Sequence, residues 1–251
     1  MASASHRERS IEDGLLCLSP AFCGEHAWCR DKMMLSKALA GGVPLPAFFR
    51  EGGFQRAIDR YAEVSGASDR RAVVSMWSLY YFSALSIPYL LARRLSGQAL
   101  PVGFEEMTIA LEDNGLPRAF GVPHAGTIES EVETESFAAV GPLLEHHLGE
   151  AVMRLRACGI SARLCWNNAA VYIDYALRLT GGAPSGGPDL PLFAHGTLPD
   201  GGVNPFCGCL SYLDEEGEKV ARRKVCCLRY MLPGIPSCGK LCALPSQRNP
   251  Q

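Results

Sequence analysis

The chain has 251 residues, of which 47% are hydrophobic and 20% are charged, and its formal net charge is -2. This length and composition are typical of a soluble globular protein that buries one substantial core. A net charge this close to zero offers no basic field for a nucleic-acid backbone, so nucleic-acid binding is not expected.

The cysteine content favours metal binding over disulfide bonds. There are 11 cysteines, and an odd number fits a complete disulfide framework badly. Residues 1–10 lack the basic and then apolar pattern of a secretory signal. We therefore expect the thiols to stay reduced in a cytoplasm, where they are available as metal ligands.

Helices are predicted for the N-terminal part of the chain. Residues 10–40 read as helical until a stretch rich in glycine and proline ends the pattern, and a second helix is expected over about 48–64. Cys17, Cys23 and Cys29 lie in the first of these segments. Because their six-residue spacing does not keep to one helical face, a metal shared by all three is not expected.

The segment Ala72–Ala92 is predicted to be a long helix and contains no charged residue. Its length could span a bilayer, but it holds four serines, three tyrosines and a proline, and arginines at both ends give no orientation. Trp77, Tyr81 and Leu85 recur at a spacing that usually means core packing. We predict a buried core helix; a spanning helix and a peripheral membrane contact are the alternatives.

A β-hairpin is predicted after this helix. Met107, Ile109 and Leu111 alternate with less apolar residues, and Asn114-Gly115 follows, a pair that readily takes the positive φ angles of a tight turn. The acidic stretch 129–135 is expected to be a solvated loop.

Two further helices are predicted, over Phe137–Cys158 and about Ala162–Leu179, the second stopped by glycines. His146 and His147 could ligate iron, but neighbouring helical residues diverge by about 100°, so both are predicted at the surface. Cys158 and Cys165 are expected to be structural, since a buried free cysteine behaves as a small hydrophobic residue.

Loops rich in glycine and proline are expected over 181–205, followed by a strand at Phe206–Tyr212. Together these segments predict a mixed α+β, helix-rich fold. It would comprise N-terminal helices, a central β-hairpin or small sheet with helices, and a C-terminal cysteine-rich extension. Residues 1–215 would form the body, without an internal boundary, and residues 216–251 the metal-binding segment.

Four cysteines, Cys226, Cys227, Cys238 and Cys242, fall within seventeen positions near the chain end. A structural zinc site normally uses two cysteines a few residues apart, and a directly adjacent pair suits it poorly. A [2Fe–2S] cluster accepts ligands from different directions and is favoured here, with zinc as the alternative. Basic neighbours would stabilise an anionic cluster, or simply form a solvated face: Arg222, Arg223, Lys224, Arg229 and Lys240.

The segment 222–234, Arg-Arg-Lys-Val-Cys-Cys-Leu-Arg-Tyr-Met-Leu-Pro-Gly, resembles the C-terminal signature of the FhuF-like ferric siderophore reductases. That family carries a Cys-Cys-x10-Cys-x2-Cys motif that binds a [2Fe–2S] cluster. Weaker similarities lie at 74–81 and at 165–169. This chain departs from the motif, because three residues separate Cys238 from Cys242. Cys207 and Cys209 lie nearby in sequence and could replace a ligand.

The resemblance implies a [2Fe–2S] cluster held by the four C-terminal cysteines and no catalytic residue beyond it. The cluster would pass one electron to siderophore-bound Fe(III), of hydroxamate type, and release Fe(II) in the cytoplasm. Trp166, Asn167 and Asn168 would line the docking face or surround the cluster, and Arg229 would contact the substrate. Alternatively, these residues are structural: Trp166 packs in the core, and the amides of Asn167 and Asn168 fix the start of a helix.

No Gly-x-Gly-x-x-Gly follows a predicted strand, so no built-in nicotinamide or flavin site is expected. Electrons would come from a ferredoxin-like protein or from reduced flavin. Other functions consistent with the sequence are a non-enzymatic iron–sulfur electron carrier, a binding module with structural zinc, and a relative of siderophore-biosynthesis proteins.

Overall fold

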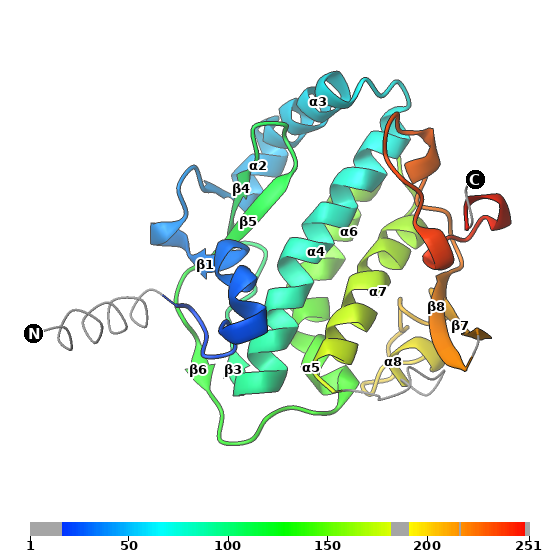
Figure 1. Cartoon of the computed structure of the whole chain (residues 1–251). Helices are drawn as coiled ribbons and strands as arrows, with labels where there is room; N and C mark the ends of the chain where they lie inside the picture. Colours follow the sequence, from blue (N-terminus) through cyan, green and yellow to red (C-terminus); the bar gives the residue numbers. More distant parts are fainter. Residues whose placement is uncertain (1–16, 182–190, 216, 249–251) are drawn as a thin grey trace, which may run out of the picture.

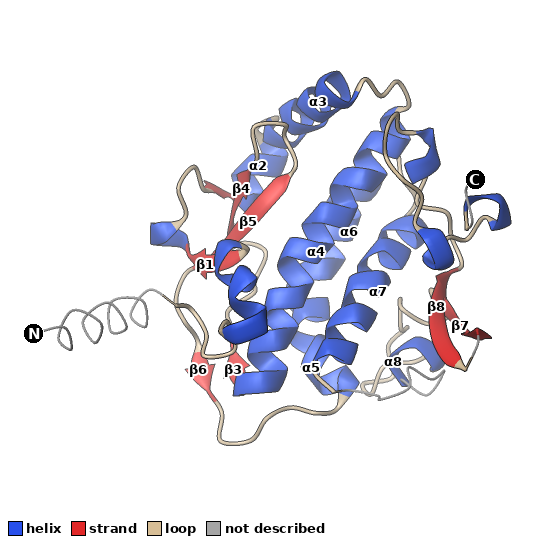
Figure 2. Ribbon diagram, viewed as in Figure 1, coloured by secondary structure: helices blue, strands red, loops and turns tan. Residues whose placement is uncertain are grey.

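The computed structural model describes residues 17–181, 191–215 and 217–248 (Figure 1). Its fold is mixed α and β and rich in helix, with small sheets and a cysteine-rich C-terminal region, as predicted (Figure 2). The helices are α2 (Leu45–Arg50), α3 (Gly53–Ser65), α4 (Arg70–Ser96), α5 (Ser136–Leu143), α6 (Gly149–Arg156), α7 (Ala162–Leu179) and α8 (Pro191–Ala194). The strands are β1 (Met33–Leu35), β2 (Val43–Pro44), β3 (Gln98–Ala99), β4 (Thr108–Leu111), β5 (Pro117–Val122), β6 (Thr127–Ile128), β7 (Leu210–Glu215) and β8 (Glu218–Arg223).

Helix α4 is the central element, and it is a buried core helix as predicted. The Asp69 carboxylate accepts hydrogen bonds from the backbone N–H groups of Arg71 and Ala72 and so caps the helix start. Gly97, at φ 61°, ends it in the left-handed conformation. Within the described ranges, no helix combines the length and apolar character needed to cross a membrane.

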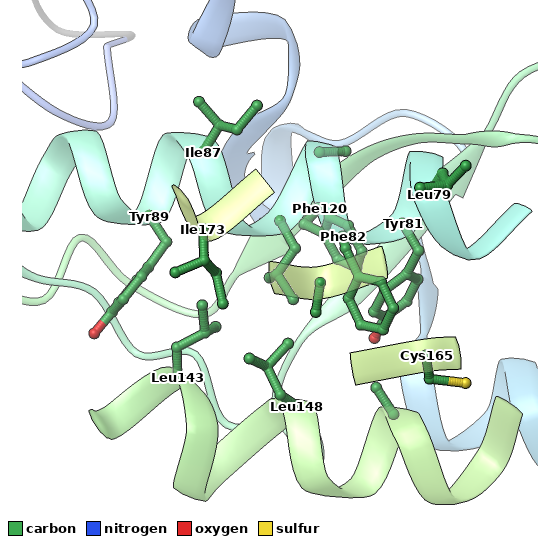
Figure 3. Packing of buried hydrophobic residues seen from close by; sticks show 14 of the residues in the cluster. Leu79, Tyr81, Phe82, Ile87, Tyr89, Phe120, Leu143, Leu148, Cys165 and Ile173 are labelled. Carbon is green, nitrogen blue, oxygen red and sulfur yellow. The ribbon is translucent and has the colours of Figure 1, made fainter. Parts of the chain in front are cut away.

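The core lies between α4 and the elements packed on it, namely α7, α5 and β5. Figure 3 shows Phe82 of α4 together with Phe120 of β5, Leu148 of the turn that follows α5, and Ile173 of α7. All four side chains are fully buried. Burying one such side chain contributes roughly 1.5–3 kcal/mol, so this cluster fixes the position of α4 and α7.

The largest sheet has four strands in the order β1-β5-β4-β2. Strands β4 and β5 form the predicted hairpin, with Ile109 opposite Phe120. Gly115 in its turn has a φ of 86°, and a Cβ there would collide with the Ala57 carbonyl of α3. The Trp77 indole donates to the Gly115 carbonyl at 3.0 Å, which ties the turn to α4.

The prediction of helix over residues 10–40 is wrong where the structure describes them, and residues 10–16 lie outside the described part. A 3-10 helix, η1 (Gly24–Asp31), is followed by β1, which pairs with β5 in parallel, and by a 3-10 turn, η2 (Ser36–Ala38). Pairing with a strand far along the chain decides this segment, and such pairing leaves no local helical signal. The helix predicted over 48–64 is two helices, because Gly52 takes a φ of 75° between α2 and α3.

The helix predicted over 137–158 is present, with a π-helical turn, η3 (Leu144–Leu148), between α5 and α6. This turn carries His147 into the core, where it is fully buried, so its predicted surface position is wrong. His146 is exposed, as predicted. A π-helical turn shifts the helical phase by an added residue, which a 3.6-residue period does not anticipate.

The predicted second helix coincides with α7, and Ser161 caps it by accepting a hydrogen bond from Leu164 N–H at 3.2 Å. The strand predicted at Phe206–Tyr212 begins at Leu210 and pairs with β8, which the sequence did not reveal. After β8 the chain lies beside the N-terminal half of α4 and beside α7 (Figure 1). It contains three 3-10 turns, η4 (Arg229–Met231), η5 (Gly239–Leu241) and η6 (Pro245–Gln247).

Candidate functional site

The four C-terminal cysteines lie on two turns of the segment after β8. Cys226 and Cys227 precede η4, while Cys238 and Cys242 flank η5. The Cys227 and Cys238 sulfurs are 3.2 Å apart. Cys227 and Cys242 are buried, and Cys226 and Cys238 are partly exposed. The turn rich in glycine and proline between the pairs therefore folds the second pair back towards the first.

The backbone around the first pair is held in a special conformation. Leu228 has a φ of 62°, and among the described residues it is the one non-glycine residue with a positive φ. Its N–H points back and donates to the Cys226 sulfur at 3.3 Å. The Ser75 hydroxyl on α4 donates to the Cys227 carbonyl at 2.7 Å. An uncommon backbone conformation of this kind persists only where surrounding contacts fix it, and here they hold the Cys226 sulfur and the Cys227 carbonyl.

The pKa of the Cys227 thiol is lowered to about 5. The main cause is the hydrogen bond from the Cys238 thiol, and the positive charges of Arg223 and Arg229 act in the same direction. The same pairing raises the pKa of Cys238. Burial raises the pKa of the Cys226 thiol. The site therefore stabilises negative charge on sulfur at Cys227.

Arg223 is buried, and two asparagines of α7 hold its guanidinium. Its Nη1 donates to the Asn168 side-chain oxygen at 2.6 Å and to that of Asn167 at 3.3 Å. The Asn168 amide donates in turn to the hydroxyl of Ser78, at 2.8 Å, and to that of Ser75. A fully satisfied buried polar network of this kind specifies one arrangement of its members. It connects α4, α7 and β8 directly behind the Cys227 carbonyl.

Arg229 leaves a buried donor without an acceptor. Its Nε is inaccessible to solvent and has no hydrogen-bond partner among the described residues. A buried unsatisfied donor typically costs about 1–3 kcal/mol, more when charged, so it calls for an explanation. Because Arg229 acts electrostatically on both Cys227 and Cys238, an anionic group bound by these sulfurs would offer it an acceptor.

The residues present fit an iron–sulfur cluster in their chemistry. The donors are thiols near two arginines, and hydrogen bonds and positive charge stabilise anionic clusters. In the part of the chain that the structure describes, no group of three His, Cys, Asp or Glu residues is arranged to hold one metal ion. A two-iron cluster spreads its four ligands over two centres, so it does not require such an arrangement.

A cavity of about 490 Å³ opens beside Cys238, between α4, α7 and the C-terminal segment. Its walls are largely apolar and aromatic, with Trp28 and Tyr175 among the lining residues. Arg178, Arg223 and Arg229 also line it, and Asp174 is its one carboxylate among the described lining residues. Asp174 pairs with Arg178 at 2.8 Å and accepts from the Tyr212 hydroxyl at 2.7 Å. The remaining positive charge suits oxygen-rich ligands.

The site residues predicted from the sequence differ in their burial and in their distance from the cysteine segment. Asn167 and Asn168 are fully buried behind the cysteines, and Arg229 lines the cavity. Trp166 is partly exposed and packs edge-on against Phe206, with ring centroids 5.4 Å apart. The Asn167 amide also donates to the Cys209 carbonyl.

Cys207 and Cys209 lie just before β7; the Cys207 sulfur donates to the Ala194 carbonyl at the end of α8, and the Cys209 sulfur to the Pro205 carbonyl. Burial raises the pKa of the Cys209 thiol to about 11. The pKa values of the Cys226 and Cys238 thiols are raised as well, so this shift does not separate Cys209 from the four C-terminal cysteines.

Sequence reasoning missed Ser75 and Ser78, which join the cysteine segment to α4. A signal was present, because two serines three residues apart share a face of a helix that otherwise carries apolar residues there. It also missed the cavity lining from Trp28, which lies in the segment wrongly predicted to be part of a long helix.

Comparisons with known proteins relate the chain to a family of iron reductases, through a family-model match that ends before the four C-terminal cysteines. The model of a family described as "Ferric iron reductase FhuF-like transporter" matches residues 75–217, from α4 to the β7–β8 turn. A "Ferric siderophore reductase" of Escherichia coli (strain K12) is 26% identical over 185 residues. The similarity covers 68% of this chain and 65% of that relative, slightly less than two thirds of its length.

Proposed function

Because the chain belongs to the family described as ferric iron reductase FhuF-like transporter, we propose that it reduces siderophore-bound Fe(III) by one electron. The observation that carries the proposal is the cysteine segment beside an arginine-lined cavity. Fe(III) is a hard ion that siderophore oxygens hold tightly, whereas Fe(II) is less charged and held weakly. Reduction would therefore release the iron without an acid or base at the metal.

In this proposal Cys226, Cys227, Cys238 and Cys242 hold a [2Fe–2S] cluster. When bound, the cluster would supply single electrons at a potential set by neighbouring charge, hydrogen bonds and solvent exposure. The chain contributes the positive charge of Arg223 and Arg229 next to the sulfurs. Ser75 fixes the Cys227 carbonyl on α4, and Asn168 orients Arg223. These are positioning roles, since the three side chains are buried.

The substrate would dock at the cavity beside Cys238, and Arg229 would be its polar contact. Trp166 would lie at the outer edge of the residues that surround the cluster. Apolar and aromatic walls suit the methylene chains of a hydroxamate siderophore, and arginine donors suit its carbonyl oxygens. Docking there brings the ferric ion next to the cysteine segment, so electron transfer needs no long path.

We place the reaction in the cytoplasm, at most with a peripheral contact to the membrane, and we assign the electron supply to a ferredoxin-like protein or reduced flavin. All eleven cysteines are free thiols, which supports a reducing compartment.

Metal analysis of anaerobically purified protein tests the cofactor. We expect iron and acid-labile sulfide in equal amounts, with the visible absorption of a [2Fe–2S] centre. A colourless protein with one zinc per chain would refute the reductase and make the segment a structural zinc module.

Anaerobic mixing of the reduced, cluster-loaded protein with a ferric hydroxamate, in the presence of a ferrous chelator, tests the activity. We expect the protein to reoxidise while the ferrous complex accumulates in proportion. A cluster that stays reduced would instead make the protein an electron carrier that does not use siderophores.

A further inference from the structure

Positive charge is concentrated at the C-terminal end of the chain. Residues 219–251 contain seven lysines and arginines and no aspartate or glutamate. The rest of the chain has 17 basic and 26 acidic residues. The net charge of -2 is therefore the sum of a basic C-terminal region and an acidic remainder.

Five side chains form what we call the basic collar: Arg163, Arg222, Lys224, Lys240 and Arg248. Backbone carbonyls next to cysteines hold several of them in place. Arg163 donates to the Cys207 carbonyl at 3.0 Å, and Arg248 donates to that of Cys242 at 3.0 Å. Arg222 donates to the Lys240 carbonyl at 3.4 Å, which joins β8 to the turn between Cys238 and Cys242.

Two collar charges approach each other at Gly208. A Cβ built on that glycine would lie 3.4 Å from the Arg163 guanidinium and 3.8 Å from the Lys224 ammonium. Within the described part of the chain, no carboxylate lies within ion-pair distance of Arg163, Lys224 or Arg248. Like charges held together repel one another, so Arg163 and Lys224 raise the local positive potential.

The collar is separate from the arginines of the cavity. Arg178, Arg223 and Arg229 line the cavity, whereas no collar residue does. Arg163, Lys224 and Lys240 are exposed to solvent. The site therefore presents two faces to partners, a cavity for a small molecule and an outer basic surface.

We propose that the basic collar is the docking surface for an acidic one-electron redox protein that supplies the electrons. The inference rests on the proposed function, since a one-electron reductase must receive its electrons from a donor. A protein with a local acidic patch fits the collar, because its other surfaces need not approach the acidic remainder of this chain. A membrane or a nucleic acid is a wide polyanion and would meet that remainder as well.

Charge complementarity of this kind acts mainly on the rate of encounter and on partner choice. It is screened over about 8 Å at physiological ionic strength, so it predicts binding that weakens as salt rises. Lys224 and Lys240 each lie two residues before a cysteine, Cys226 and Cys242, so a partner bound at the collar is close to the cysteine segment.

Binding is tested without turnover, with an oxidised plant-type ferredoxin as the acidic probe and calorimetry as the measurement. The variant Lys224→Glu/Lys240→Glu reverses two collar charges. The matched control Lys37→Glu/Arg118→Glu makes the same change of charge at η2 and at β5, and β5 lies across α4 from β8 and the segment that follows it (Figure 1). We expect the collar variant to raise the Kd at low salt about tenfold or more, and the control to change it less than twofold.

Equal Kd values for the collar variant and the wild type would overturn the proposal, as would a wild-type Kd that does not respond to salt. Stronger binding of the wild type to phosphatidylserine vesicles than to ferredoxin would overturn it too. The neutral variant Lys224→Gln/Lys240→Gln should give an intermediate Kd, which separates loss of charge from misfolding. Because no ferric chelate is present, these outcomes do not depend on whether the reductase proposal stands.

Discussion

At the scale of single residues, the ligand assignment is the first prediction. Cys238→Ser removes the sulfur that lies 3.2 Å from Cys227, and serine is a poor replacement for a soft thiolate ligand. We expect this variant to lose the cluster or to shift its absorption strongly. Absorption spectra and iron content of anaerobically prepared protein provide the measurement.

The control for this prediction is Cys17→Ser. Cys17 is partly buried in the N-terminal loop, and its sulfur donates to the Ser19 and Phe22 carbonyls, so its replacement should leave the spectrum unchanged. Cys207→Ser is the informative third variant. If it abolished the cluster while Cys242→Ser retained it, the ligand set proposed from the C-terminal motif would be incorrect.

A second prediction concerns Asn168, which joins three elements. Asn168→Ala leaves the buried Arg223 guanidinium without its 2.6 Å acceptor and the Ser78 hydroxyl without its 2.8 Å donor. Removing one partner from a buried charged group is costly, and we expect a loss of about 3 kcal/mol in the free energy of unfolding. Urea denaturation with an unchanged m-value would measure it.

The matched control is Gln55→Ala, which removes an amide from an exposed helix position with a single 3.4 Å hydrogen bond to Asp59. Such a surface change should stay within about 0.5 kcal/mol. Equal losses for the two variants would show that the network around Arg223 contributes no more than a surface hydrogen bond.

At the scale of elements, the π-helical turn explains a buried histidine. His147 Nδ1 is 2.9 Å from the Val102 carbonyl, which can only accept, so Nδ1 carries the proton. Its Nε2 therefore accepts from the Tyr81 hydroxyl at 2.6 Å. Burial lowers the pKa of His147 from 6.5 to about 4, because an imidazolium would be poorly solvated there.

A pH dependence of stability follows from this histidine. The unfolded chain binds a proton at His147 below about pH 6.5, while the folded chain does so only near pH 4. The neutral side chain therefore contributes stability above pH 6.5 that is lost as the pH falls towards 4, by about 3 kcal/mol in total. The free energy of unfolding measured by urea at pH 7 and at pH 4.5 should reveal most of this change.

Other groups titrate over the same range, so His147→Gln serves as the reference. The variant should be less stable than the wild type at pH 7, and the difference should shrink as the pH is lowered. A difference that stayed constant between pH 7 and pH 4.5 would mean that His147 keeps its proton affinity on folding.

The elements also show what local sequence can predict. Helix α4, the hairpin around Asn114-Gly115 and helix α7 were predicted because periodicity, turn residues and capping residues all lie within each segment. Strand β1 and strand β8 were not, because each is defined by a partner strand and not by its own pattern. For the same reason the burial of His147 could not be predicted without the aromatic residues around it.

At the scale of the molecule, the candidate site is formed by segments that are far apart in the sequence. The C-terminal motif identified the cysteines, but it could not predict the cavity, because the lining of the cavity combines Trp28, residues of α4 and α7, and the turn at Cys238. The predicted boundary at residue 215 falls at the turn of the β7–β8 hairpin. Core residues on both sides of it, including Cys209 and Leu232, belong to one hydrophobic cluster.

The last prediction concerns removal of the metal. The described residues after β8, 224–248, form no long helix or sheet. They hold their shape through short turns, the Ser75 hydrogen bond and packing on α4. A ligand that binds only the folded site stabilises the part that forms it. We therefore expect cluster loss to speed amide hydrogen exchange over 224–242 by at least about tenfold, while exchange in α4 and α7 stays slow. Mass spectrometry of loaded and cluster-free protein measures both.

Two other results would contradict this expectation. Exchange that rose equally in α4 would mean that the cluster supports the whole fold. Unchanged exchange over 224–242 would mean that these cysteines hold no metal.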